Sequence, residues 1–219
     1  ISMMNGIELL EKIIPLYSVP DLFTETAEKI VFIFFNYSFL PFFMIIPLMV
    51  SSIIAANSVV GEKERKTLET LLYTPVTNRE FLVAKLFSSF LPAVFVSIIS
   101  FAGYFLAVNA VYLLLRNVLL IRTIIWLPAM LVMAPSVSIL GLAVTLLVSL
   151  KAKSFMEAQQ TSGIIVVPFL ALLFVQITGV VTFKPLYLLI FSAVLLAAAY
   201  VIITKIGPRF DRERIITTI

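Results

Sequence analysis

Long apolar runs alternate with short polar segments along most of the chain. Five runs, at residues 31–59, 81–115, 124–150, 155–181 and 185–206, are each long enough to cross a bilayer, which takes about 20 apolar residues in a helix. The apolar residues within each run are continuous and do not alternate with polar ones, which favours helices over barrel strands. The pattern predicts an all-α polytopic membrane helix bundle with five visible spans.

Two further patterns interrupt the apolar runs. Prolines lie in or beside every predicted span: Pro41, Pro47, Pro92, Pro128, Pro135, Pro168 and Pro185. We expect kinks at these positions, with neighbouring helices bonding to the carbonyls that proline frees. A few polar residues also fall inside the spans: Asn36, Tyr37, Ser38, Asn57, Ser97, Ser100, Asn109, Ser136, Ser138 and Gln176. Most of them are expected to form hydrogen bonds between helices.

Composition agrees with a membrane protein and excludes several kinds of chemistry. The 219 residues are 61% hydrophobic and 13% charged, whereas soluble domains carry about 25% charged residues. There is no His and no Cys. This excludes Ser-His catalysis, cysteine nucleophiles, His/Cys zinc sites and thiolate iron–sulfur clusters. No metal site and no catalytic residue is predicted.

Basic residues are distributed unequally between the two sides of the predicted bundle. Eleven of the 16 Lys and Arg residues fall on one side: Lys63, Arg65, Lys66, Arg79, Lys85, Lys151, Lys153, Lys205, Arg209, Arg212 and Arg214. The other five are Lys12, Lys29, Arg116, Arg122 and Lys184. Because positive loops stay in the cytoplasm, we expect the 61–85 loop and the C-terminal tail, residues 207–219, to be cytoplasmic. The visible N-terminus is then expected outside.

The segment before the first span, residues 1–29, is therefore expected to be extracellular. Ile7, Leu10, Ile13 and Ile14 fall on one helical face, which predicts a short amphipathic helix at the membrane interface. An outside N-terminus is simplest to explain if a further span precedes Ile1. We therefore expect six spans in the full protein, with both ends inside, and the transmembrane domain over residues 30–206.

The loop at 61–80 carries the most informative pattern. Leu68, Leu71 and Leu72 share one helical face, while charged residues from Glu62 to Glu69 cover the rest, and Glu62 is spaced to pair with Lys66. Pro75 ends this predicted helix. The loop could be a solvated turn, or an apolar ridge ringed by charge that docks on another protein.

Capping patterns mark two helix starts next to polar loops. Thr77-x-x-Glu80 reads as a capping box that opens the second span, with Val76 and Phe81 as its hydrophobic staple. Ser154-x-x-Glu157 reads as another box that opens the fourth span. We interpret the second loop, on its own, as a tight connection.

The run from Gly61 to Val76, GEKERKTLETLLYTPV, followed by REFLVAK from Arg79 to Lys85, resembles the intracellular loop of type-2 ABC exporter permeases. The second loop, KSFMEAQ from Lys153, resembles the sodium-extrusion-permease-like branch. The resemblance implies a half-transporter that dimerises, as a homo- or heterodimer, and passes substrate outward. It also implies an ATP-binding cassette subunit that binds ATP and Mg²⁺. The implied coupling residues are Glu62, Glu64, Arg65, Thr67, Leu68, Glu69, Leu71 and Leu72.

The remaining residues narrow the choice of function. None of the seven glycines fits the G-x-x-x-x-G-K-[ST] phosphate loop, so we expect no ATPase site on this chain and no cofactor of its own. Every acidic residue lies in a loop, at an end of a span or in the extracellular segment, which argues against ion-coupled transport. The alternative to a cell-membrane exporter permease is an assembly protein that recruits a cytosolic partner through the charged loop. A lipid-modifying enzyme is disfavoured because Glu62, Glu64 and Glu69 alternate with basic residues.

Overall fold

The computed structural model describes residues 14–65, 77–121, 123–177 and 185–206. Within them the chain is helical, and the short elements named η are 3₁₀ or π turns. The elements in order are η1 (Ile14–Leu16), α2 (Thr26–Ile33), η2 (Phe34–Ser38), α3 (Leu40–Ala56), η3 (Asn57–Gly61), α4 (Glu62–Glu64), α6 (Asn78–Arg116), α7 (Thr123–Pro128), η4 (Ala129–Met133), α8 (Ala134–Ser149), α9 (Phe155–Gly163), α10 (Val166–Ile177) and α11 (Pro185–Ile206).

The predicted helical membrane bundle is confirmed. By length and composition, five helical stretches in the described residues can cross a membrane: Thr26–Glu64, Glu80–Arg116, Trp126–Ser149, Phe155–Gln176 and Leu186–Lys205. The first stretch joins α2, η2, α3, η3 and α4 into one helix of 39 residues. The predicted fourth span is not one uninterrupted helix, because a turn at 164–165 separates α9 from α10.

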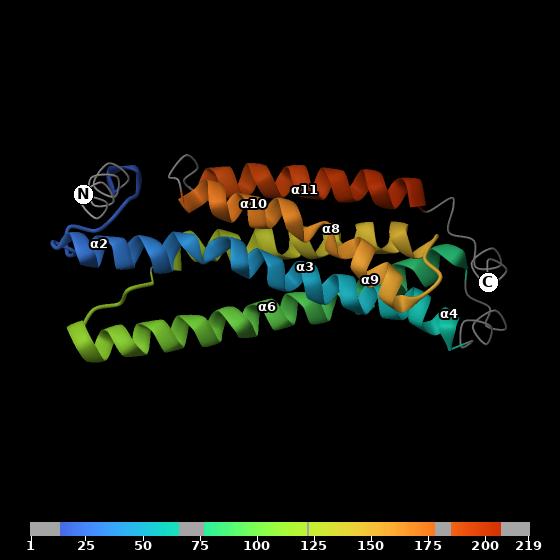
Figure 1. Cartoon of the computed structure of the whole chain (residues 1–219), viewed down its shortest axis with the longest axis horizontal. Helices are drawn as coiled ribbons and strands as arrows, with labels where there is room; N and C mark the ends of the chain where they lie inside the picture. The colour runs from blue at the N-terminus through green and yellow to red at the C-terminus, as the bar shows by residue number, and fades with distance from the viewer. Residues whose placement is uncertain (1–13, 66–76, 122, 178–184, 207–219) are drawn as a thin grey trace, which may run out of the picture.

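The bundle is centred on the pair α3 and α8. The long helix α6 packs along one side of this pair, while α11 packs on α8 from the other side (Figure 1). Gly141 allows the close approach of α8 to α3, because a side-chain Cβ there would lie 2.8 Å from Leu48 Cδ1 and 2.9 Å from Ser51 Oγ. Aromatic residues fill the space between α3, α6 and α7, where Trp126 is fully buried against Phe43 and Phe101.

Two π segments lie directly before prolines. Pro41 and Pro135 each occupy the second position of an α-helix that follows a π segment, η2 or η4. A proline ring clashes with the carbonyl four residues earlier, and a widened π turn relieves that clash. Side chains from other elements bond to the carbonyls of η2. Gln176 Nε2 donates to Tyr37 O, and Tyr104 Oη donates to Phe35 O at 2.7 Å, as expected for spans that contain proline.

The segment before the first span packs against the end of the bundle. Tyr17 and Phe23 are buried in a cluster with Phe32 and Leu120. Tyr17 Oη donates to Gln176 O at 3.1 Å. Burial, and to a lesser extent the nearby Tyr37, raises the pKa of the Tyr17 hydroxyl. The hydroxyl therefore stays a neutral donor. The amphipathic helix predicted around Ile7, Leu10 and Ile13 lies outside the described residues, and Ile14 begins the short 3₁₀ turn η1.

Candidate functional site

The end of the first span is held to the start of the second by an ion pair. The carboxylate of Glu62, the first residue of α4, accepts a hydrogen bond from the ammonium group of Lys85 in α6. The same ammonium lies 5.1 Å from the centre of the Phe81 ring. The sequence predicted that Glu62 pairs with Lys66, which lies outside the described residues. The partner that the structure shows is 23 residues away.

Lys63 is buried, contrary to the prediction from the sequence. It was placed with the charged side of a solvated helix, yet only 6% of its surface is exposed. Glu62 to Glu64 continue the first span, so Lys63 is covered by the surrounding bundle end. Glu64 and Arg65 are exposed. Of the described residues predicted to contact a partner, these two are the ones that face outward.

The start of α6 has the predicted capping box. Thr77 is the N-cap, and its Oγ1 accepts from the Glu80 backbone N–H at 3.3 Å. The Glu80 carboxylate accepts in return from the Thr77 backbone N–H at 2.9 Å. The backbone N–H groups of Thr77 and Glu80 are both hydrogen-bonded in this way. The second span therefore begins at a fixed residue directly after the loop. The proposed staple partner Val76 lies outside the described residues.

The start of α9 is capped differently from the prediction. Ser154 is the N-cap, and its hydroxyl accepts from the Glu157 backbone N–H at 3.1 Å. The Glu157 carboxylate bonds to the backbone N–H of Lys153 at 2.8 Å, one residue before the N-cap. The cap is therefore present, but the reciprocal bond to Ser154 is replaced by one that also fixes the preceding loop.

The second loop is packed against the end of the first span. Ala152 and Ala158 are buried together with Ala56 and Val60, and Phe155 covers this cluster. This contact was not predicted from the sequence, which indicated only a tight connection at the second loop. The available signal was Phe155 and Ala158, which lie three residues apart on one face of the first turn of α9. The structure thus brings three segments, α4 and the starts of α6 and α9, to one end of the bundle.

Five of the predicted coupling residues cannot be placed in this arrangement. Thr67, Leu68, Glu69, Leu71 and Leu72 lie outside the described residues. The described elements on either side, α4 and the start of α6, lie together at one end of the bundle, where Glu62 pairs with Lys85.

Described cations also gather at this end. Lys63, Arg65, Lys85, Lys151, Lys153 and Lys205 belong to α4, the first turns of α6, the loop before α9 and the last turn of α11 (Figure 1). At the opposite end Arg116 lies 3.1 Å from the Glu28 carboxylate. The unequal charge distribution predicted from the sequence is thus a property of the folded bundle.

Comparison with known proteins links the chain to a transporter family. A family model described as "ABC-2 family transporter protein" matches residues 3–187. No curated protein and no solved structure matches the chain. The matched range includes the first four predicted spans and the loops at 61–80 and 151–154.

Proposed function

Because the chain belongs to the ABC-2 transporter family, we propose that it is an exporter permease subunit driven by ATP hydrolysis on a separate subunit. Membership implies a multi-pass membrane subunit that works with an ATP-binding cassette subunit. Outward transport, coupling through the 61–80 segment and pairing with a second permease subunit are the finer parts of the proposal. The sodium-extrusion-permease-like branch stays a prediction.

The observation that carries the proposal is the extent of the family match, since residues 3–187 contain the whole 61–80 segment. The geometry supports it. At 1.5 Å per residue, a helix of 39 residues is about 58 Å long, nearly twice the roughly 30 Å hydrocarbon core. Such a helix extends beyond the bilayer and can carry movement of the docked segment into the spans.

Within this proposal the coupling residues have different tasks. Glu62 is engaged with Lys85, so it holds the end of the first span to the start of the second. Glu64 and Arg65, together with Thr67, Leu68, Glu69, Leu71 and Leu72, form the proposed contact with the ATP-binding subunit. ATP and Mg²⁺ would be bound by that partner, and a second permease subunit would complete the substrate path.

The test is a purification of the full chain with its partner. We expect the tagged chain to capture, from its own membranes, a subunit with phosphate-binding loop motifs and ATPase activity that vanadate inhibits. Leu68→Asp combined with Leu72→Asp should remove this subunit and the activity, because two charges would replace the apolar ridge. Leu119→Asp is the matched control, since Leu119 is 52% exposed at the opposite end of the bundle and should leave capture unchanged.

Two results would overturn the proposal. The first is capture of a partner without ATPase activity, which would favour the assembly protein that recruits a cytosolic partner. The second is full ATPase coupling in the double variant. Both variants are first checked for normal membrane levels and a single peak in gel filtration, so that a folding defect is not read as lost coupling.

A further inference from the structure

Residues 14–24 form a strap at the end of the bundle opposite α4 (Figure 1). The backbone hydrogen bonds of the strap are local turns, such as Tyr17 N–H to Ile14 O and Phe23 N–H to Pro20 O, each at 3.1 Å. Tyr17 and Phe23 are its buried side chains, at 7% and 4% exposed. Within the described residues, two aromatic anchors therefore hold the strap to the bundle.

The anchor Tyr17 contacts two separate elements of the bundle. Its hydroxyl donates to Gln176 O at 3.1 Å, in the last turn of α10, where helix carbonyls have no donor within the helix. Its ring meets the ring of Tyr37 in η2 edge-on, with 4.7 Å between the ring centres. One side chain of the strap thus contacts both the first span and the end of α10.

The junction under Tyr17 contains a buried acceptor that the closed strap leaves without a partner. Gln176 is 1% exposed, and its Nε2 donates to Tyr37 O. Its Oε1 is buried and has no hydrogen-bond partner among the described residues. An unpaired buried acceptor costs free energy that is recovered when water reaches it. The closed arrangement therefore carries a penalty that opening of the strap would relieve.

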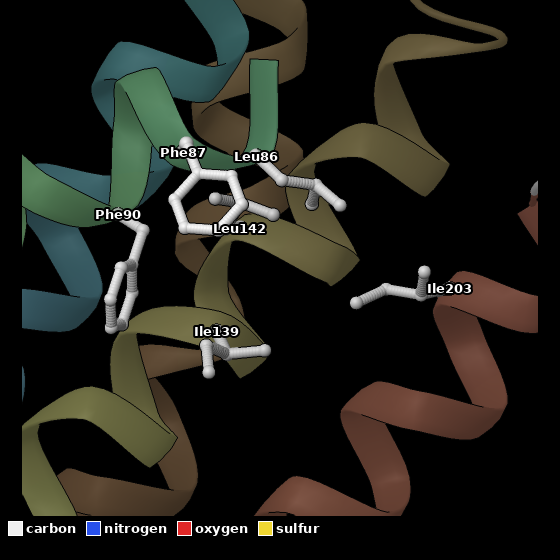
Figure 2. A pocket seen from close by; sticks show the side chains of 6 residues that line it. All are labelled: Leu86, Phe87, Phe90, Ile139, Leu142 and Ile203. Carbon is white, nitrogen blue, oxygen red and sulfur yellow. The ribbon is translucent and has the colours of Figure 1, made fainter. Parts of the chain in front are cut away.

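The strap is also loosely packed, because a hollow of about 380 Å³ lies among its residues and Lys29 of α2. Asp21, Thr24 and Lys29 contribute polar groups to the wall of this hollow, so water can enter it. The groove nearer the α4 end differs, because it lies between α6, α8 and α11 and its lining residues, such as Leu86 and Ile203, are apolar (Figure 2). Of these two hollows, the one at the strap can widen without separating packed spans.

We propose that the strap is a latch that opens and closes during the transport cycle, and that the hydrogen bond from Tyr17 to Gln176 holds it closed. Closed, it joins the end of α10 to the first span. Open, it releases the end of α10 and lets water reach the Gln176 amide. A segment with few buried contacts opens at a lower free-energy cost than the packed spans. The proposal rests on the exporter function, because the positive-inside rule predicts that this end is outside, where exported substrate leaves.

Thiol labelling of a cysteine next to the anchors measures opening, since the natural chain has no cysteine. Leu120→Cys is the reporter, because Leu120 is fully buried in one cluster with Tyr17 and Phe23. Leu119→Cys, at a position 52% exposed, is the control that reacts in every state. Val118→Cys, half-buried in the same cluster, is the second reporter if Leu120→Cys lowers membrane levels. The complex with the ATP-binding subunit is labelled with a maleimide in lipid nanodiscs, without nucleotide and during ATP hydrolysis.

Tyr17→Phe removes the hydroxyl and keeps the ring. Without nucleotide it should raise the labelling rate of Leu120→Cys roughly 2- to 10-fold, the factor that the loss of one net hydrogen bond gives, since labelling follows the open population when closing is fast. Tyr112→Phe is the matched control and should leave the rate unchanged. The Tyr112 ring lies 6.2 Å from the Phe23 ring, and its hydroxyl forms no hydrogen bond in the part of the chain that the structure describes. In the chain with Tyr17 intact, ATP hydrolysis should raise the labelling rate of Leu120→Cys and leave that of Leu119→Cys unchanged.

Three outcomes would overturn the latch and leave the permease proposal standing. The first is a labelling rate of Leu120→Cys that does not change while the complex hydrolyses ATP. The second is an equal rise in Tyr17→Phe and Tyr112→Phe, which would mean that the bond to Gln176 does not hold the strap closed. The third is labelling of Leu120→Cys as fast as Leu119→Cys before nucleotide is added. Failure to capture an ATP-hydrolysing subunit would instead overturn the permease proposal, and the latch with it.

Discussion

Individual polar side chains tie the membrane-spanning helices together. Asn36 Nδ2 donates to Leu120 O at 2.8 Å, and Gln176 Nε2 donates to Tyr37 O. The Gln176 bond joins two helices, as the sequence predicted for polar residues inside the spans, whereas Asn36 bonds to the 117–121 connection. Ser136 and Ser138 bond instead to carbonyls of their own turn, because a short side chain in a helix reaches the carbonyl four residues earlier. The predicted bond between helices is therefore present for Gln176, whereas these serines bond within their own helix.

Substitution of Asn109 tests how much a buried side-chain hydrogen bond contributes to the stability of the bundle. Its Oδ1 accepts from the backbone N–H groups of Leu120 and Ile121, at 2.9 Å each, and all three residues are buried. Asn109→Leu leaves both donors without this acceptor, at a cost of about 1–3 kcal/mol for each buried unpaired group. We expect a clear fall in the thermal unfolding temperature of the detergent-solubilised protein, followed by gel filtration with fluorescence detection.

Ser97→Ala is the control for that measurement. Ser97 lies on the same helix and is fully buried, and its Oγ has no hydrogen-bond partner among the described residues. Removing an unpaired buried hydroxyl costs little, so the unfolding temperature should stay the same or rise. If both variants lost the same stability, the two bonds of Asn109 would not be the cause.

The burial and pairing of Glu62 and Lys63 could not be predicted from the local sequence. A run of alternating charges usually marks a solvated helix face, and the pattern therefore placed both residues in water. Whether a charged residue is covered depends on segments far along the chain. Lys85 comes 23 residues later, and the α9 start that packs on η3 comes later still. No local pattern contains these contacts.

At the scale of elements, the packing of α3 on α8 depends on one glycine. A Cβ at Gly141 would meet Leu48 and Ser51 at less than 3.0 Å, and one of those atoms is the Leu48 backbone oxygen at 2.9 Å. Backbone cannot move aside as a flexible side chain does. This contact therefore sets the separation of the two central helices.

Gly141→Ala should destabilise the bundle by about 1–3 kcal/mol, the usual cost of overpacking. Gly103→Ala is the matched control, because nothing lies within 4 Å of a Cβ at that helical position. There the substitution should be neutral or stabilising by up to about 1 kcal/mol, the helix preference of Ala over Gly. Thermal unfolding of both variants under the same detergent conditions measures the difference, and equal effects would contradict the close-contact argument.

The five spans could be predicted because each one is a long apolar run, and hydrocarbon requires every backbone group to bond within its helix. The irregularities inside them were only partly predictable. Prolines indicated distortion near Pro41 and Pro135, yet they did not reveal π turns, and the third π segment, η3, contains no proline. Its side-chain packing, with Val59 and Val60 buried, arises from helices that the local sequence does not contain. The turn between α9 and α10 lies between Gly163 and Pro168, so the proline indicated a distortion there, but not that the helix is interrupted.

At the scale of the whole molecule, charge distinguishes the two ends of the bundle. The described Lys and Arg residues are concentrated at the end of the bundle where α4, α9 and the end of α11 lie (Figure 1). The segment 14–25 and the 117–121 connection lie at the other end. The positive-inside rule predicts that the α4 end is cytoplasmic. This orientation is the one that an ATP-binding subunit in the cytosol requires.

The orientation can be measured directly because the natural chain has no cysteine. We expect Asp21→Cys and Leu119→Cys, both at exposed positions, to react with a membrane-impermeant maleimide in intact cells. Lys153→Cys, exposed at the opposite end, should react only after the membrane is permeabilised. Ala143→Cys is the control for labelling of unfolded protein, since Ala143 is fully buried and should not react in either condition. The reverse pattern would place the α4 end outside, and an ATP-driven partner could then not reach the 61–80 segment.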